Sequence, residues 1–315
     1  MFGTGPFAVP SFKSLLNSDH DVLALVTRPI LDSGKRRKSA ENPTRDAGFE
    51  AGIRILDPPS ANDQDFIGVL RDLKPDLLVV CDYGQILSRQ CLATARLGGI
   101  NLHGSLLPKY RGAAPIQWCI YNGDEVTGVT IIHMTPKLDG GPCLVQEELT
   151  IDPDENSEQL EPRLAQLGVQ PVHRSIQMLS QWDGVSAIGE IQDPKLATKA
   201  PRLKKSDGLV DWNRTASQIR NQIRAFIPWP GTYTHWHSER LKQPMRLIFH
   251  SADVWDTDSD LGPGQVVGSE NDGLIIQTGS GQLVVRQIQP AGKRAMPVRD
   301  FLRGNPPQKG ERMLS

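Results

Sequence analysis

Cysteines, aromatic residues and long apolar runs are all scarce in this chain of 315 residues. It has only four cysteines and none form a CxxC pair, which argues against a disulfide framework and favours free thiols in a reducing compartment. No apolar run approaches the roughly 20 residues that a membrane-spanning helix needs. No signal peptide is visible, because no charged segment followed by an apolar stretch opens the chain, and we expect a cytoplasmic protein.

Net charge is also nearly absent, since 35 Lys and Arg face 36 Asp and Glu. This total argues against a uniformly basic nucleic-acid binder, but it hides an uneven distribution. Residues 202–315 carry 16 basic and 11 acidic side chains, whereas residues 1–201 carry 19 and 25. Basic residues are concentrated in the tail after residue 285 and in a cluster at 35–38. The sequence therefore predicts two local basic surfaces on a nearly neutral chain.

Short apolar runs rich in Val, Ile and Leu alternate with amphipathic stretches in the first two thirds of the chain. Continuous apolar strands separated by helices predict a mostly parallel sheet that is covered on both faces. A long helical region at 156–181, interrupted at Pro162 or Pro171, is expected to close this domain. The predicted strands are 22–27, 76–81, 98–102 and 128–134, and the predicted helices between them are 10–18, 62–73 and 115–122.

The pattern changes after this helical region. Residues 182–205 mix Gly, Asp, Pro and Lys, which is typical of a linker. One helical stretch at 214–226 follows, and then short apolar runs separated by glycine predict a small antiparallel barrel. We therefore expect a first domain over 1–181, the linker over 182–205, and a second domain over 206–315.

The predicted sheet begins abruptly. Only Met1 and Phe2 precede a glycine-containing loop, although strands usually have about five residues. Either the first strand starts upstream of Met1 or it is reduced to a stub. Residues 3–8 also match the dinucleotide pattern G-x-G-x-x-G/A, but no acidic residue follows the second strand. A tight strand-to-helix turn is favoured, and Arg28 leaves an NADP-dependent oxidoreductase as an alternative.

The segment 101–112 follows an apolar strand directly, so it lies where open α/β sheets bind ligands. Asn101 and His103 are two residues apart, and in an extended segment their side chains project to the same side. An amide and an imidazole placed in this way can stabilise one oxyanion. The alternative is that Asn101 caps a turn and His103 is a satisfied buried histidine. A serine hydrolase is disfavoured, because the segment lacks the second glycine of a G-x-S-x-G elbow.

A carboxylate, Asp139, follows the next predicted strand and precedes a Gly-Gly pair. At the same sheet edge as His103 it can orient the imidazole or accept a proton. Taken alone, an Asp before Gly more often forms an Asx-type turn. Metal binding is poorly supported, because His235 and His237 have no Cys or Asp cluster to complete a site.

Residues 101–116 (NLHGSLLPKYRGAAPI), with Leu138-Asp139-Gly140 downstream, resemble the methionyl-tRNA formyltransferases. Phe2-Gly3-Thr4 and Phe7-Ala8-Val9-Pro10 fit the opening turn of that family. Residues 224–231 (RAFIPWPG) and 289–296 (QPAGKRAM) match its second domain. The resemblance covers essentially the whole chain, with both domains in order.

The resemblance implies a Rossmann-like catalytic domain followed by an OB-like β-barrel that helps to hold tRNA. It implies transfer of the formyl group of 10-formyltetrahydrofolate to the α-amine of methionyl-initiator tRNA, for translation initiation. We expect a monomer without a metal, although the sequence does not determine the oligomeric state. The family's catalytic residues fall on Asn101, His103 and Asp139. Its tetrahydrofolate-binding stretch falls on Ser105, Leu106, Leu107 and Pro108, and residues 83–87 would line the pterin pocket.

Transfer of an acyl group between two nitrogens passes through a tetrahedral oxyanion and requires no covalent enzyme intermediate. We expect Asn101 and protonated His103 to donate to that oxyanion, while Asp139 keeps His103 charged and helps to remove the amine proton. The family also uses a basic loop after the second strand, here 28–38, to reach the acceptor end of tRNA. Ser33 stands where the family commonly has Arg, so Arg36 or Arg37 is the expected contact.

Two other functions stay open. A sugar-nucleotide N-formyltransferase can share Asn-Leu-His-Gly-Ser-Leu-Leu-Pro and Pro-Trp-Pro, but residues 289–296, the 35–38 cluster and the basic tail favour tRNA. Phosphate contacts at these basic residues would make tRNA binding more salt-sensitive than folate binding. A folate- or RNA-binding module without turnover is the second alternative, and the joint presence of Asn101, His103 and Asp139 argues against it.

Overall fold

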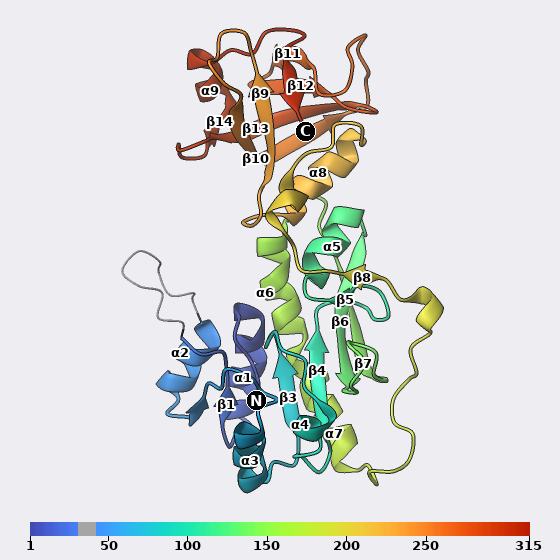
Figure 1. The fold of residues 1–315 in the computed structure, drawn as a ribbon. Coiled ribbons are helices and arrows are strands. Elements are labelled where there is room, and N and C mark those ends of the chain that lie inside the picture. Colours follow the sequence, from blue (N-terminus) through green and yellow to red (C-terminus); the bar gives the residue numbers. More distant parts are fainter. Residues whose placement is uncertain (31–41) are drawn as a thin grey trace. The chain divides into compact units, whose positions relative to one another are not determined.

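The computed structural model describes residues 1–30 and 42–315, and its chain divides into two compact units (Figure 1). Most of the basic loop, with Ser33 and the cluster at 35–38, lies outside the described residues. The first unit consists of Met1–Pro115, Val126–Thr150 and Leu160–Pro201, and the second of Ile116–Glu125, Ile151–Gln159 and Arg202–Ser315.

The sheet of the first unit has the order β3-β4-β6-β7, and Phe2 joins it to the parallel pair β1-β2. Phe2 forms parallel bridges to both Val26 and Val80, so a single residue occupies the position of the first strand. The carboxyl ends of β3 and β4 lie side by side, because these strands are parallel and Cys81 pairs with Leu102. The strands are β1 (Leu25–Val26), β2 (Ile55–Leu56), β3 (Leu78–Cys81), β4 (Gly99–His103), β6 (Val126–His133) and β7 (Cys143–Thr150).

The sheet is parallel from β2 to β4 and antiparallel in its last two strands. β6 runs antiparallel to β4, although its residues from Thr127 to Ile132 are all buried, as those of a parallel strand would be. Such a run reports burial on both faces and not strand direction. β7 alternates between half-buried and exposed residues, as an antiparallel edge strand does.

The helical region before residue 181 breaks at Gly168, and the predicted interruption at Pro162 or Pro171 is wrong. A Cβ atom on Gly168 would lie 2.7 Å from Leu102 Cδ2, so the close approach to β4 requires glycine. Pro162 stays inside its helix, and Pro171 lies in the first turn of the next helix. The helices are α1 (Val9–Leu16), α2 (Pro43–Glu50), α3 (Gln64–Leu73), α4 (Arg89–Leu92), α5 (Pro115–Asn122), α6 (Ser157–Leu167) and α7 (Val169–Ser180), with the 3-10 turns Pro6–Ala8, Pro194–Leu196 and Lys205–Gly208.

The second unit is an antiparallel β-domain, as predicted, with the strand order β11-β12-β13-β10-β9-β15. Its last strand closes the sheet, because Val266 N donates to Glu311 O (2.9 Å) and Met313 N donates to Gly264 O (2.7 Å). Closure removes the two free edges of the sheet. Its elements are α8 (Ala216–Ala225), β9 (Thr232–His237), β10 (Met245–Trp255), β11 (Val266–Glu270), β12 (Gly273–Gln277), β13 (Gln282–Pro290), β14 (Met296–Pro297), α9 (Val298–Gly304) and β15 (Arg312–Leu314).

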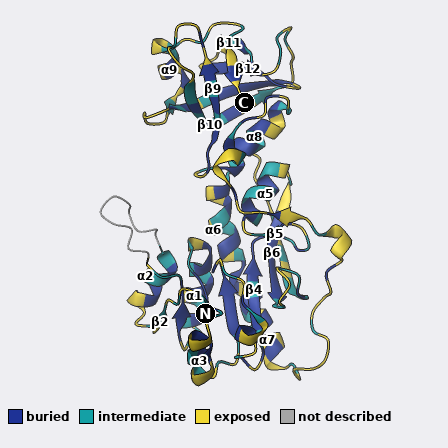
Figure 2. Ribbon diagram, viewed as in Figure 1, coloured by how far each residue is buried: buried dark blue, intermediate teal, exposed yellow. Residues whose placement is uncertain are grey.

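Each unit has a core of its own. Figure 2 shows the central strands of both units in the buried class and many of the turns between elements in the exposed class. Trp236, Leu247 and Phe249 fill the barrel interior, and Phe2, Val80 and Leu78 pack together in the first unit. No helix in the described ranges is both long and apolar enough to cross a membrane.

Candidate active site

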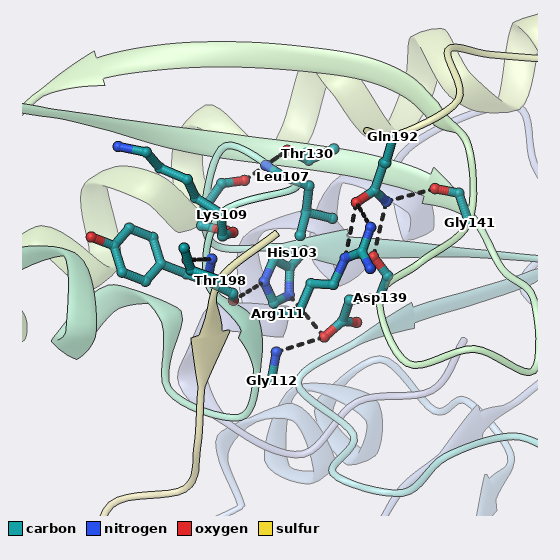
Figure 3. Close-up of polar contacts among 12 residues, drawn as sticks. His103, Leu107, Lys109, Arg111, Gly112, Thr130, Asp139, Gly141, Gln192 and Thr198 are labelled. Carbon is teal, nitrogen blue, oxygen red and sulfur yellow. Dashed lines mark hydrogen bonds and ion pairs between the residues drawn. The ribbon is translucent and has the colours of Figure 1, made fainter. Parts of the chain in front are cut away.

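His103 ends β4 and is almost fully buried, with 6% of its side chain exposed. Its Nε2 lies 2.9 Å from the carbonyl oxygen of Tyr110 (Figure 3). A carbonyl oxygen can only accept, so Nε2 carries a proton and donates it to this bond. Nδ1 is therefore the ring nitrogen left for other chemistry, and it faces the Asp139 carboxylate with 3.9 Å between Nδ1 and Oδ2.

Asp139 reaches His103 from the loop between β6 and β7. Its Oδ2 accepts a hydrogen bond from Gly112 N at 2.8 Å, and its side chain is 10% exposed. Its backbone has a φ of 46°, a left-handed conformation that costs a non-glycine residue energy and persists only when its surroundings hold it. The carboxylate is thus bound to the segment after β4 rather than to its own turn.

Asn101 lies two residues before His103 on β4, so both side chains project from the same face of the strand. It is half-buried. Within the described part of the chain its side-chain amide makes no hydrogen bond. The structure therefore leaves the amide available for a ligand, and the capping role that we considered for Asn101 is absent there.

The Ser105–Pro108 turn is fixed by one buried hydroxyl on β6. Thr130 Oγ1 donates to Ser105 O (2.7 Å) and accepts from Leu107 N (3.0 Å). It also accepts from Gln146 Nε2 (2.9 Å), which uses all the hydrogen-bonding capacity of the hydroxyl. Ser105 and Leu107 are buried, whereas Leu106 and Pro108 are half-buried. Of the four predicted folate-binding residues, Leu106 and Pro108 therefore have partly accessible side chains.

Replacing Thr130 with valine should loosen this turn, because the shape is kept while the buried Leu107 amide loses its acceptor. We expect the free energy of unfolding to fall by about 1–3 kcal/mol. We also expect the KM for the folate donor to rise roughly tenfold, which corresponds to about 1.4 kcal/mol. Thr127→Val is the matched control on the same strand, because within the described residues the buried Thr127 hydroxyl has no partner. Equal effects of the two substitutions in thermal unfolding and donor titrations would contradict this role.

The loop after β3 is held by Arg28. Its Nε donates to Tyr83 O (3.1 Å), and one of its terminal nitrogens donates to Gly84 O (2.9 Å). The guanidinium that could have met a 2′-phosphate is therefore engaged with backbone carbonyls, which removes the support for the NADP alternative. In this loop Tyr83 and Leu87 are buried, and Ile86 is 58% exposed.

Sequence reasoning missed Gln192, which lies in the predicted linker but is 8% exposed in the first unit. Its Oε1 accepts from Arg111, and its Nε2 donates to Asp139 O and Gly141 O. A single glutamine among Gly, Asp, Pro and Lys carries no local signal of such a role. Thr130 was also missed, although a polar residue inside an apolar run was a signal that could have found it.

Family models match both units. A model described as formyl transferase covers residues 1–176, and one described as formyl transferase, C-terminal domain, covers residues 202–306. A methionyl-tRNA formyltransferase from Rhodopirellula baltica is 42% identical, over 100% of this chain and 96% of the relative. A methionyl-tRNA formyltransferase from Geobacter sulfurreducens is 36% identical, over 99% of this chain and 95% of the relative.

Solved structures share the fold at low identity. The N-formyltransferase from Helicobacter canadensis, solved with folinic acid and dTDP-3-aminofucose, has a TM-score of 0.62 and 16% identity, over 90% of this chain and 96% of that one. HypX from Aquifex aeolicus, solved with tetrahydrofolic acid, has a TM-score of 0.54 and 14% identity, over 81% of this chain and 43% of the HypX chain. Likeness at this level of identity is a likeness of fold.

Proposed function

The chain belongs to the formyl transferase family, and from this premise we propose that it transfers the formyl group of 10-formyltetrahydrofolate to the α-amine of methionyl-initiator tRNA. The observation that carries the reaction type is the approach of Asp139 to His103 Nδ1 at the carboxyl end of β4, on the face that also bears Asn101. The choice of acceptor rests on the full-length similarity to methionyl-tRNA formyltransferases. A monomer suffices for this scheme, because one chain supplies all three residues.

The proposed roles follow from the available atoms. The Asn101 amide and an Nδ1 proton of His103 donate to the formyl oxygen as negative charge builds on it. The Nε2 proton is already held by Tyr110 O, so a second proton on Nδ1 makes the ring cationic, and the Asp139 carboxylate stabilises that cation. Within the described ranges Asp139 Oδ1 has no hydrogen-bond partner, and it is the oxygen that accepts the proton of the attacking amine. The same proton returns to the folate nitrogen as the bond between that nitrogen and the formyl carbon breaks, which releases tetrahydrofolate.

The residues at this sheet edge fit a folate donor, which when bound supplies an activated formyl group. Ile86 presents a large apolar side chain to solvent, on a loop whose backbone Arg28 fixes. Leu106 and Pro108 are partly accessible on a turn that Thr130 holds. An apolar surface with few oriented polar groups is the usual character of a small-molecule site. These residues would bind the flat ring of the donor and exclude water around the formyl carbon.

The second unit supports a nucleic-acid partner through the charges of its tail. Several basic residues after residue 285 pair with carboxylates, including Arg286 with Asp253. Four others are exposed and form no ion pair with any described residue, so they remain available to phosphate groups. These four are Lys293, Arg294, Lys309 and Arg312.

One assay tests the proposed function. The protein is incubated with 10-formyltetrahydrofolate and with methionyl-initiator tRNA, methionyl-elongator tRNA or an amino-sugar nucleotide. We expect formylmethionyl-tRNA from the initiator and little product from the other two. Formylation of the sugar nucleotide alone would assign the chain to the sugar N-formyltransferases, and no formylation of any acceptor would favour a binding module.

A further inference from the structure

Residues 190–200, which we call the strap, connect the two loops of the candidate site. At one end Glu190 and Cys143 exchange two backbone hydrogen bonds of 2.8 Å each, directly after the Asp139 loop. At the other end β8 (Lys199–Ala200) pairs with β5 (Arg111–Gly112), which follows the turn of residues 105–108. The strap therefore contacts both segments that converge on His103.

Gln192 is the strap residue whose buried side chain reaches both loops (Figure 3). Its Oε1 accepts from two nitrogens of the Arg111 guanidinium, at 3.1 and 2.6 Å. Its Nε2 donates to Asp139 O at 2.9 Å and to Gly141 O at 2.6 Å. Guanidinium groups only donate and carbonyl oxygens only accept, so this environment determines which end of the amide is oxygen and which is nitrogen.

These four bonds use both donors and both lone pairs of the Gln192 amide. Glutamate could still accept from Arg111, but its second oxygen would face two carbonyl oxygens and repel them. Methionine has a similar length and would leave all four groups without a partner. Glutamine therefore meets a requirement that neither an acid nor an apolar residue of the same size can meet.

The two carbonyls that Gln192 binds lie in the chain segment that sets the direction of the Asp139 carboxylate. Asp139 is held in a left-handed conformation, and Gly141 has no room for a Cβ atom, which would lie 1.9 Å from His133 O. Loss of the bonds from Gln192 would free this segment to relax toward an unstrained backbone. The carboxylate would then shift away from His103 and from Gly112 N.

We propose that Gln192 is a positioning residue, which acts through Asp139 by fixing that carboxylate beside His103 and by bracing Arg111 against the same loop. This inference rests on the proposed formyl transfer. A displacement of about 1 Å at a catalytic group can cost on the order of 100-fold in rate. Substrate binding does not need the Asp139 carboxylate in this scheme, so the effect belongs to kcat.

Steady-state kinetics of Gln192→Met and Gln192→Glu test the proposal. We expect both substitutions to lower kcat by about 10- to 100-fold, with the KM of donor and tRNA within about threefold of the wild type. Ile191→Ala, at a neighbouring strap residue that is 85% exposed, is the matched control and should leave kcat unchanged. A kcat within twofold of the wild type in either Gln192 variant would overturn the proposal. If the methionine variant does not fold, the glutamate variant decides.

A double-mutant cycle separates positioning from general stabilisation. In an Asp139→Asn background Gln192→Met should lower kcat by less than about threefold further, because its effect passes through the carboxylate that is already lost. A full additional loss would overturn the proposal.

Hydrogen exchange gives a readout that needs no activity. The Gly112 N–H donates a hydrogen bond to Asp139 Oδ2. Its hydrogen should exchange with solvent roughly tenfold faster in Gln192→Met and at the wild-type rate in Ile191→Ala. Unchanged Gly112 protection in Gln192→Met would refute the positioning role. Wild-type protein that formylates no methionyl-tRNA would instead refute the proposed function.

Discussion

Replacing Asn101 with alanine is expected to lower kcat by about 10²–10³-fold, the usual cost of losing one oxyanion donor. The amide is half-buried on the face of β4 that carries His103, and among the described residues it has no protein partner to lose. The substitution should therefore leave folding unaffected and remove only a bond to the reacting oxygen. Single-turnover formylation of methionyl-tRNA at saturating donor measures this effect directly.

An isosteric substitution sharpens the test of Asn101. Asn101→Asp keeps the shape but places an acceptor-only carboxylate against the developing negative charge, so its kcat should fall at least as far as that of the alanine variant. A substrate-binding role would instead raise KM in both variants with kcat little changed. An alanine variant that turns over within a few-fold of the wild type would show that Asn101 is not an oxyanion donor.

Asp139→Asn should reduce kcat by about 10²–10⁴-fold, the range that general acid–base catalysis contributes. Asparagine tolerates the left-handed backbone that Asp139 adopts, and its amide oxygen can still accept from Gly112 N. The substitution thus keeps the loop and removes only the negative charge beside His103 Nδ1. The rate of formyl transfer at saturating substrates reports the loss of that charge.

Asp272 provides a control with the same backbone conformation. It has a φ of 59° and a 70% exposed side chain that pairs with Arg299 at 3.6 Å. Asp272→Asn makes the same chemical change far along the chain from the candidate site, and its kcat should match that of the wild type. If both Asp→Asn variants lost activity equally, the charge of Asp139 would have no specific part in the reaction.

The residues that strand geometry alone brings together could be predicted from the sequence. Asn101 and His103 share a face because side chains alternate along a strand. The expectation that Asp139 follows a strand ending at the same edge as His103 is wrong, because β6 is antiparallel to β4 and His133 at its end pairs with Ile100; the loop after β6 brings Asp139 back to His103. The direction of β6 could not be predicted, because its apolar run reports only burial. The close approach of Gly168, at the helix break, to Leu102 joins residues far apart in the chain, so no local pattern predicts it.

The partners of the supporting residues of the site were hidden for the same reason. Gln192 is recognisable only through its partners, which are backbone carbonyls and a guanidinium from two distant loops. Thr130 likewise acts on groups about 25 residues earlier in the chain. Neither role follows from a motif, because a backbone atom that accepts or donates a hydrogen bond leaves no trace in the residue type that carries it.

The hydrogen bond from His103 Nε2 to Tyr110 O means that a backbone atom, and not a side chain, sets the orientation of the imidazole. No side-chain substitution at position 110 can delete the carbonyl oxygen that accepts from Nε2. A substitution could only turn this carbonyl in another direction, by changing the backbone conformation, which has a φ of 63° at Tyr110. The path of the backbone around Tyr110 therefore determines that Nε2 of the imidazole carries a proton. Ordering of this loop also orients the imidazole, so a chain that has not completed the loop around Tyr110 lacks the acceptor that holds the Nε2 proton of His103.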